Sequence, residues 1–133
     1  MNYFLDTNTC IYYLKGSSPR IAARLRRTSP KRIKIPAVVK AELLLGAEKS
    51  GRRERVLKSL SEFLIPFEVV SFGDESTYHY AEIRADLERR GLPIGPNDLL
   101  IAAIVRAAEG TLITNNVRGF RLVKSLKVQD WSK

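Results

Sequence analysis

Short apolar runs of strand length alternate with helical segments along the whole chain, and this alternation constrains the fold more than any other feature of the sequence. Strands are expected at residues 2–5, 32–35, 67–71 and 111–114, with the apolar pair 122–123 as a fifth. Helices are expected at 8–15 and 19–27, from 36 to Gly51, from Gly51 to 63, from 74 to Gly91 and from 97 to Gly110, with Asp74 and Asn97 as N-caps. The pattern predicts an α/β fold, a three-layer α/β/α domain whose central parallel sheet has four or five strands joined by right-handed crossovers.

The length of 133 residues indicates a single domain that spans residues 1–133. No apolar run approaches the ~20 residues of a membrane-spanning helix, and the N-terminus lacks the pattern of a signal peptide. Cys10 is the only cysteine and has no partner for an intrachain disulfide, and no cysteine–histidine cluster is present for zinc. We therefore expect a cytoplasmic protein that does not bind membranes.

Three acidic residues stand in segments that are otherwise predicted to be buried. Asp6 follows the first apolar strand, Glu42 interrupts the apolar helical stretch 38–45, and Asp98 opens the apolar helix 99–105. Carboxylates are almost never fully buried unless they are paired or bound to a metal. Three of them, far apart in the sequence and each attached to core structure, favour one shared site for a hard cation.

Each acid also has a purely structural alternative. Asp6 could cap the helix that follows it, although Asn8 could do the same. Asp98 in a first helical turn would gain ~0.3–1 kcal/mol from the helix dipole. Glu42 lies on or beside the apolar side of its helix, where an ion pair with an arginine is the main rival explanation. The three taken together favour the joint site.

The chemistry of such a site is metal-dependent cleavage of phosphodiester bonds. Mg²⁺ and Mn²⁺ prefer oxygen ligands, and a bound ion can activate water, orient the scissile phosphate and offset charge on the leaving oxygen. Ligands of parallel sheets lie beyond the carboxyl ends of the strands, where Asp6 and the pair 115–116 are expected. No Ser–His or Cys–His nucleophile is recognisable, and His79, the only histidine, is expected to pack on its own helix. An aspartyl phosphotransferase is disfavoured because position 8 is asparagine.

Most of the positive charge lies in one segment of the chain. Between Thr7 and Ala41 there are nine basic residues and no acid, so this segment accounts for the whole formal net charge of +9. A clustered basic stripe is the expected footprint of a nucleic-acid backbone, and we take Arg24, Arg26 and Arg27 as its candidate contacts. The alternative is a solvated helix face, while an anionic membrane is disfavoured because the segment lacks a strong apolar face.

The motifs of the chain resemble those of PIN-domain ribonucleases, and more narrowly those of the VapC toxins of VapBC toxin–antitoxin modules. The resemblance covers nearly the whole chain and rests on the order and spacing of these segments: Leu5-Asp6-Thr7-Asn8, Ala41-Glu42-Leu43, residues 95–102 with Gly95-Pro96-Asn97-Asp98, Thr114-Asn115-Asn116, Phe120, and Val128-Gln129-Asp130-Trp131.

The resemblance implies an α/β/α fold and a Mg²⁺ or Mn²⁺ site in which Asp6, Glu42 and Asp98 are the metal ligands and catalytic acids. It also implies a homodimer inhibited by a VapB-type antitoxin, which inserts a C-terminal segment near the acidic pocket and binds operator DNA through its other end. The implied activity is endoribonuclease cleavage of RNA, in this subgroup of initiator tRNA in its anticodon loop. Asn116 is implied as a further catalytic residue, and the expected substrate-binding residues are Asn8, Thr114, Arg24, Arg26 and Arg27.

The chain departs from many of these relatives at the fourth acid, which they carry at the position of Asn116 or of Gly119. Because neither residue is acidic here, we expect one metal ion rather than two. If a second ion binds, Glu82 is the candidate that completes its ligands. Two other functions stay open from the sequence: a PIN nuclease of RNA processing or repair that has no antitoxin, and a catalytically silent RNA-binding module.

Overall fold

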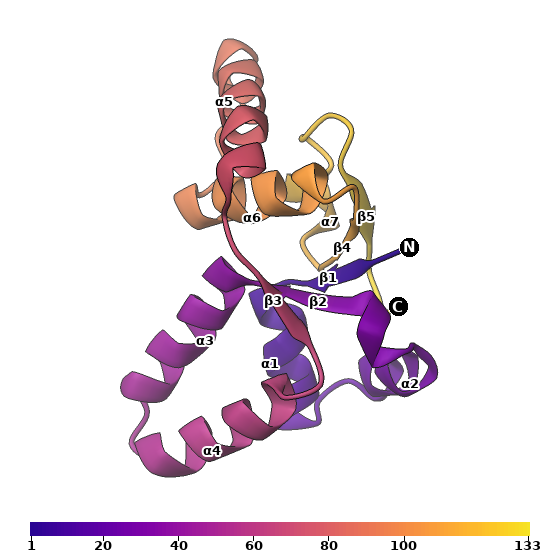
Figure 1. The fold of residues 1–133 in the computed structure, drawn as a ribbon, viewed down its shortest axis with the longest axis vertical. Coiled ribbons are helices and arrows are strands. Elements are labelled where there is room, and N and C mark those ends of the chain that lie inside the picture. The colour runs from indigo at the N-terminus through magenta and orange to yellow at the C-terminus, as the bar shows by residue number, and fades with distance from the viewer.

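The computed structural model describes residues 1–133 as a five-stranded parallel sheet between two layers of helices (Figure 1). The strands are β1 (Tyr3–Leu5), β2 (Ile33–Pro36), β3 (Glu68–Val70), β4 (Thr111–Ile113) and β5 (Lys127–Gln129). The helices are α1 (Thr7–Lys15), α2 (Pro19–Arg27), α3 (Ala37–Glu48), α4 (Arg53–Leu64), α5 (Asp74–Arg89), α6 (Pro96–Ala107) and α7 (Val117–Phe120), with a 3₁₀ turn η1 at Pro30–Arg32. Helices α1 to α4 lie on one side of the sheet and α5 to α7 on the other, which confirms the predicted three-layer α/β fold.

The order of the strands creates a switch point in the middle of the sheet. The order is β3-β2-β1-β4-β5, so the chain leaves β1 toward one edge and later returns to pair β4 with the other side of β1. Leu5 pairs in register with Ile113, so Asp6 and Thr114 follow two neighbouring strands at the same edge. Ligands of open parallel sheets bind in the crevice at such a point.

The most deeply buried part of the core lies in β1, β4 and α6. Phe4, Leu5, Leu112 and Ile113 are at most 1% exposed, and residues 101–105 of α6 are equally buried. Strands buried on both faces are nearly continuous in apolar residues, as the sequence of these two strands is. No helix combines the length and the apolar character that a membrane crossing requires.

The predicted fifth strand at 122–123 is wrong. Leu122 and Val123 lie in the turn after α7, where the Val123 N–H donates to the Phe120 carbonyl, and the fifth strand is Lys127–Gln129. Val123 is buried, so the apolar pair contributes to the core although it does not form a strand. The true β5 pairs only with β4, and two of its three residues, Lys127 and Gln129, are polar and exposed, so its sequence carries little apolar signal.

Three predicted helix starts are also corrected. Helix α1 begins at Thr7 with Asp6 as its N-cap, and α6 begins at Pro96 with Gly95 rather than Asn97 at the cap position. Asp74 is the first residue of α5 instead of its cap. Proline suits the first helical position because its missing N–H would have no partner there, which explains the earlier start of α6.

Candidate active site

Asp6 ends β1 and caps α1 at the switch point of the sheet. Its carboxylate accepts a hydrogen bond of 2.8 Å from the Thr9 N–H, and its own N–H donates to the Ile113 carbonyl of β4. The side chain is 6% exposed. Burial raises the pKa of Asp6 above its ordinary value, Glu42 raises it further by repulsion, and hydrogen bonds from Thr114 and Thr9 oppose this rise. Asp6 is therefore both a helix cap and a buried acid held beside a second carboxylate.

Glu42 reaches the same place from the middle of α3. Its Oε1 accepts a hydrogen bond of 2.7 Å from the hydroxyl of Thr7, the first residue of α1. Glu42 takes part in none of the ion pairs of the structure, which all lie elsewhere. The rival explanation of Glu42 as the partner of an arginine is therefore wrong.

Asp98 approaches from the other layer, in the first turn of α6. Its side chain is partly buried, and it takes part in none of the ion pairs of the structure. Burial raises the pKa of Asp98, and repulsion by Glu42 and by Asp6 raises it further. The helix dipole would favour an acid at this position, yet the surroundings make its charge costly.

We interpret the three carboxylates as one candidate site, which is electrostatically incomplete. Asp98 is destabilised as an anion by both other acids, and Asp6 by Glu42, while no lysine or arginine neutralises any of them. No three such side chains are close enough to enclose an ion by themselves. This donor set fits a hard divalent cation that keeps several waters, as Mg²⁺ usually does, rather than an ion in an all-protein cage. Asp6, Glu42 and Asp98 would hold it.

Thr114 and Asn116 follow β4 at the edge of the site. Thr114 is fully buried, and its hydroxyl accepts the Asn116 N–H at 3.0 Å besides interacting with Asp6. The predicted contact of Thr114 with RNA is therefore wrong, because no RNA can reach this side chain. Asn116 is exposed and caps α7 by accepting the Gly119 N–H at 3.3 Å. A Cβ at position 119 would lie 2.7 Å from the Asn116 amide nitrogen, so the glycine makes room for this cap.

The exposed residues beside the three acids are polar. Asn8 is exposed in the first turn of α1. The Asn115 amide donates a hydrogen bond of 3.0 Å to the Tyr12 hydroxyl, which ties the segment after β4 to α1. Asn8 is thus placed where a substrate could meet it, and its role in binding remains a prediction.

The basic residues of α2 lie at the opposite end of the sheet from the acids. Figure 1 shows α2 beside both chain termini, and the guanidinium of Arg24 stacks over Trp131 at 4.7 Å. Trp131 in turn packs against Tyr3, the first residue of β1. Arg24 therefore fastens the C-terminal segment to α2, whereas Arg26 and Arg27 are exposed and remain candidate RNA contacts.

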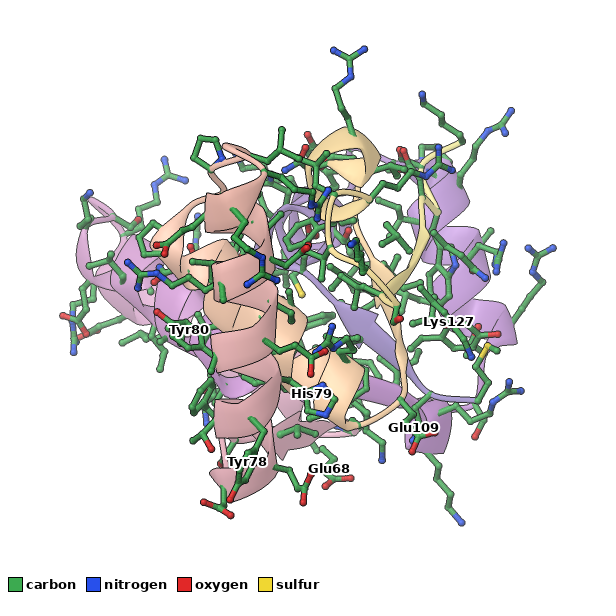
Figure 2. All side chains as sticks on the ribbon, turned by 90° about the horizontal axis from the view of Figure 1, so that it is seen from above. Glu68, Tyr78, His79, Tyr80, Glu109 and Lys127 are labelled. Carbon is green, nitrogen blue, oxygen red and sulfur yellow. The ribbon has the colours of Figure 1, made fainter.

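His79 and Glu82 belong to a separate polar cluster around Arg106. Arg106 donates to the His79 Nδ1 at 2.8 Å and to a Glu82 oxygen at 2.7 Å, which joins α5 to the C-terminal part of α6. Figure 2 shows His79 on the side of α5 that faces Glu109 and Lys127. Asp98 stands at the other end of α6, about 12 Å away along the helix. Glu82 as a fourth metal ligand is therefore wrong, and His79 has a structural partner on α6 beyond its own helix.

The sequence interpretation missed two residues that touch the acids, Thr7 and Thr9. Both stand in the segment that follows Asp6, so a hydroxyl near the site was visible in the sequence. The partner of the Thr7 hydroxyl is 35 residues away in the chain, and only the fold brings the two together.

We expect the three acids to lower the stability of the cation-free protein at neutral pH. The folded-state pKa values of Asp6 and Asp98 are raised, so the folded state holds protons that the unfolded chain releases, and stability falls as pH rises above about 4. Asp98→Asn should therefore unfold at a higher temperature than the wild type at pH about 7, and this difference should shrink below pH about 4. Thermal unfolding followed by circular dichroism measures both. A variant less stable than the wild type at neutral pH would contradict the repulsion inferred here.

Comparisons with known proteins show which family the chain resembles. A family model described as the PIN domain matches residues 3–126. The chain is 37% identical to Ribonuclease VapC2 of Rickettsia felis, with 100% of both chains covered, and 34% identical to the tRNA(fMet)-specific endonuclease VapC of Salmonella typhimurium, with 98% of both covered. Among solved structures it is similar to VapBC2 of Rickettsia felis bound to a promoter DNA fragment, with a TM-score of 0.93 at 36% identity, 98% of this chain and 99% of that chain being covered. DNA-bound VapBC of Salmonella typhimurium gives the same TM-score at 34% identity, with 98% of both chains covered.

Proposed function

Because the chain belongs to the PIN-domain family, among its VapC ribonucleases, we propose that it is a Mg²⁺- or Mn²⁺-dependent endoribonuclease, the toxin of a VapBC module. The observation that supports this proposal is that Asp6, Glu42 and Asp98 repel one another near the switch point of the sheet, and that no ion pair neutralises any of them. When bound there, the metal ion supplies an activated water and offsets the charge that develops on the leaving oxygen.

The residues of the site have different proposed roles in metal binding, in positioning and in RNA binding. The three carboxylates would hold the ion and its waters in place, and those not bound directly to it would be available to accept a proton from water. Thr9 and Thr114 fix the Asp6 carboxylate from within the fold. Asn8 and Asn116 are exposed amides at the rim of the site, where they can orient the RNA strand without adding charge.

We propose initiator tRNA, cut in the anticodon loop, as the substrate, and the cytoplasm as the place where its cleavage blocks translation. Two relatives bear the name tRNA(fMet)-specific endonuclease. The test is to incubate the purified protein with initiator and elongator methionine tRNA in Mg²⁺, in Mn²⁺ and in EDTA, and to sequence the new RNA ends. We expect one cut in the initiator anticodon loop that EDTA prevents. Equal cutting of both tRNAs would refute the substrate, and cutting in EDTA would refute the metal dependence.

The partner we propose is a VapB-type antitoxin, which binds operator DNA while it inhibits a homodimer of this chain. Several similar solved structures are of VapBC complexes, two of them bound to DNA. A groove of about 460 Å³ runs between α1, α3 and α4 and has Glu42 in its lining. Its apolar lining includes Ile11, Leu14 and Leu60. An apolar antitoxin segment in this groove would end beside the three acids and exclude RNA from them.

The basic stripe should contribute RNA affinity through Arg26 and Arg27 rather than through Arg24. Replacing Arg26 and Arg27 by glutamine should weaken RNA binding and reduce its salt dependence, because each lost phosphate contact lowers the single-strand slope by ~0.7. Arg24→Gln should instead cost about 0.5–1 kcal/mol of folding stability, since it removes the contact with Trp131. Binding measured against salt concentration distinguishes the two variants. An unchanged slope for the double variant would mean that this surface is only solvated.

A single metal ion is the stoichiometry that we propose. Two divalent ions at the ~3.5–4 Å spacing of two-metal sites repel strongly, and carboxylates are what offset this repulsion. Asn116→Asp should keep the cap of α7, because aspartate caps as well as asparagine does, and should tighten Mn²⁺ binding. Gly119→Asp should fail to do so and should lose stability, because its Cβ collides with the Asn116 side chain. Calorimetric titration measures the Mn²⁺ affinity of both variants. Equal tightening of Mn²⁺ binding by the two variants would contradict this geometry.

A further inference from the structure

We infer that Thr7 is a positioning residue for RNA cleavage, whose hydroxyl holds the Glu42 carboxylate in the orientation that the metal site requires. The inference rests on the proposed function and goes beyond it, because it assigns a role to a residue outside the acidic trio. The hydroxyl hydrogen bond is short, at 2.7 Å, and joins two helices that are 35 residues apart in the chain. It is the only hydrogen bond to the Glu42 side chain in the structure.

The donor to Glu42 is neutral although cations are near. Lys15 and Arg55 line the same groove as Glu42, yet neither forms an ion pair with it. A lysine or arginine on Glu42 would fix the carboxylate but would also cancel the charge that attracts a metal ion. A hydroxyl fixes it and leaves the charge in place. Outer-shell donors of this kind orient metal ligands and tune them.

The position of Thr7 in the fold makes it suited to this task. Thr7 is the first residue of α1, directly after the N-cap Asp6, so the backbone that fixes one acid also fixes the donor to another. The β-branch of threonine restricts χ1, which limits the directions that its hydroxyl can take. Thr7 thereby couples Asp6 on β1 to Glu42 on α3 through two adjacent residues.

The test compares Thr7→Val, which keeps the shape and loses the hydroxyl, with Thr7→Ser, which keeps the hydroxyl. Mn²⁺ binding by the RNA-free protein is measured by calorimetry, and cleavage of initiator tRNA is measured in parallel. We expect Thr7→Val to weaken Mn²⁺ binding or to lower kcat/KM by about 10–100-fold, as losses of outer-shell partners do, and Thr7→Ser to restore most of it. In a Glu42→Gln background, Thr7→Val should weaken Mn²⁺ binding further by less than about twofold, because the residue acts through Glu42.

Thr28→Val is the matched control, since Thr28 also donates a hydrogen bond of 2.7 Å from a half-buried hydroxyl, but to the Arg24 carbonyl away from the acids. It should leave Mn²⁺ binding and cleavage as in the wild type. If circular dichroism shows that Thr7→Val is unfolded, Thr7→Ala is used in its place, because alanine also lacks the hydroxyl.

The outcomes separate the inference from the proposed function. If the wild type binds Mn²⁺ and cleaves RNA, and folded Thr7→Val does both equally well, the role of Thr7 is refuted and the proposed function stands. An additive loss in the Glu42→Gln background also refutes it, because Thr7 would then act independently of Glu42. If Asp98→Asn binds Mn²⁺ as tightly as the wild type, the proposed metal site is wrong, and the role of Thr7 falls with it.

Discussion

Asp6→Asn, Asp98→Asn and Glu42→Gln should each abolish RNA cleavage while the protein remains folded. Each substitution removes a charged oxygen ligand and keeps the size of the side chain, and asparagine at position 6 still caps α1. Loss of an outer-shell partner of a metal ligand lowers metal affinity or activity by about 10–100-fold. Loss of a ligand itself should therefore lower kcat/KM by at least about 100-fold. Cleavage of initiator tRNA with Mn²⁺ at saturating concentration measures the loss, and circular dichroism checks the fold.

Asp74→Asn provides a matched control for Asp98→Asn. Asp74 is also an aspartate in the first turn of a helix, but it is exposed and lies on α5, outside the acidic trio. If Asp98 served only to complement the helix dipole, the two variants should behave alike, with a small change in stability and full activity. Full activity of folded Asp98→Asn would therefore contradict the metal site.

Filling the groove between α1, α3 and α4 should release the toxin from its antitoxin without reducing its activity. Gly46 lies in the lining of this groove on α3, and a Cβ there would have no heavy atom within 4 Å. Gly46→Phe places a ring in the space that we assign to the antitoxin segment, and a non-glycine residue also favours the helix by about 0.5–1 kcal/mol. Loss of a central apolar contact at an interface costs about 2 kcal/mol or more, so we expect at least a 30-fold weaker complex.

Ala85→Phe on the exposed surface of α5 is the control for this variant. Inhibition of tRNA cleavage by the cognate VapB-type antitoxin is titrated for the wild type and for both variants. We expect only Gly46→Phe to escape inhibition. Equal inhibition of all three would place the antitoxin elsewhere, and loss of cleavage by Gly46→Phe itself would mean that the groove serves the RNA instead.

The sequence was sufficient to predict the layers of the fold and to single out the three acids as candidates, because both depend on strong local contrasts. Buried parallel strands such as β1 and β4 are apolar along their length, and a carboxylate stands out in such a segment. The edge strand β5 has no such contrast, since Lys127 and Gln129 are exposed, and it was misplaced onto the more apolar pair 122–123. Strand assignment from apolar runs is weakest at the edges of a sheet.

Contacts between residues that are distant in the sequence could not be predicted from the sequence. The sequence predicted that Glu42 would need a partner but could not distinguish an arginine from the Thr7 hydroxyl. It likewise placed Arg24 among the RNA contacts, because a basic stripe does not reveal that one of its members stacks on Trp131 more than 100 residues away. Such choices depend on tertiary geometry, which charge and periodicity do not specify.

The most direct measurement is a calorimetric titration of the RNA-free protein with Mn²⁺, carried out on the wild type and on Asp98→Asn at a pH of about 7, because carboxylates must be deprotonated to bind a metal ion. If Asp6, Glu42 and Asp98 form one metal site, the wild type should bind a single Mn²⁺ ion, and the variant should bind it at least about tenfold more weakly. Undiminished binding by Asp98→Asn would show that the three carboxylates do not share a metal ion.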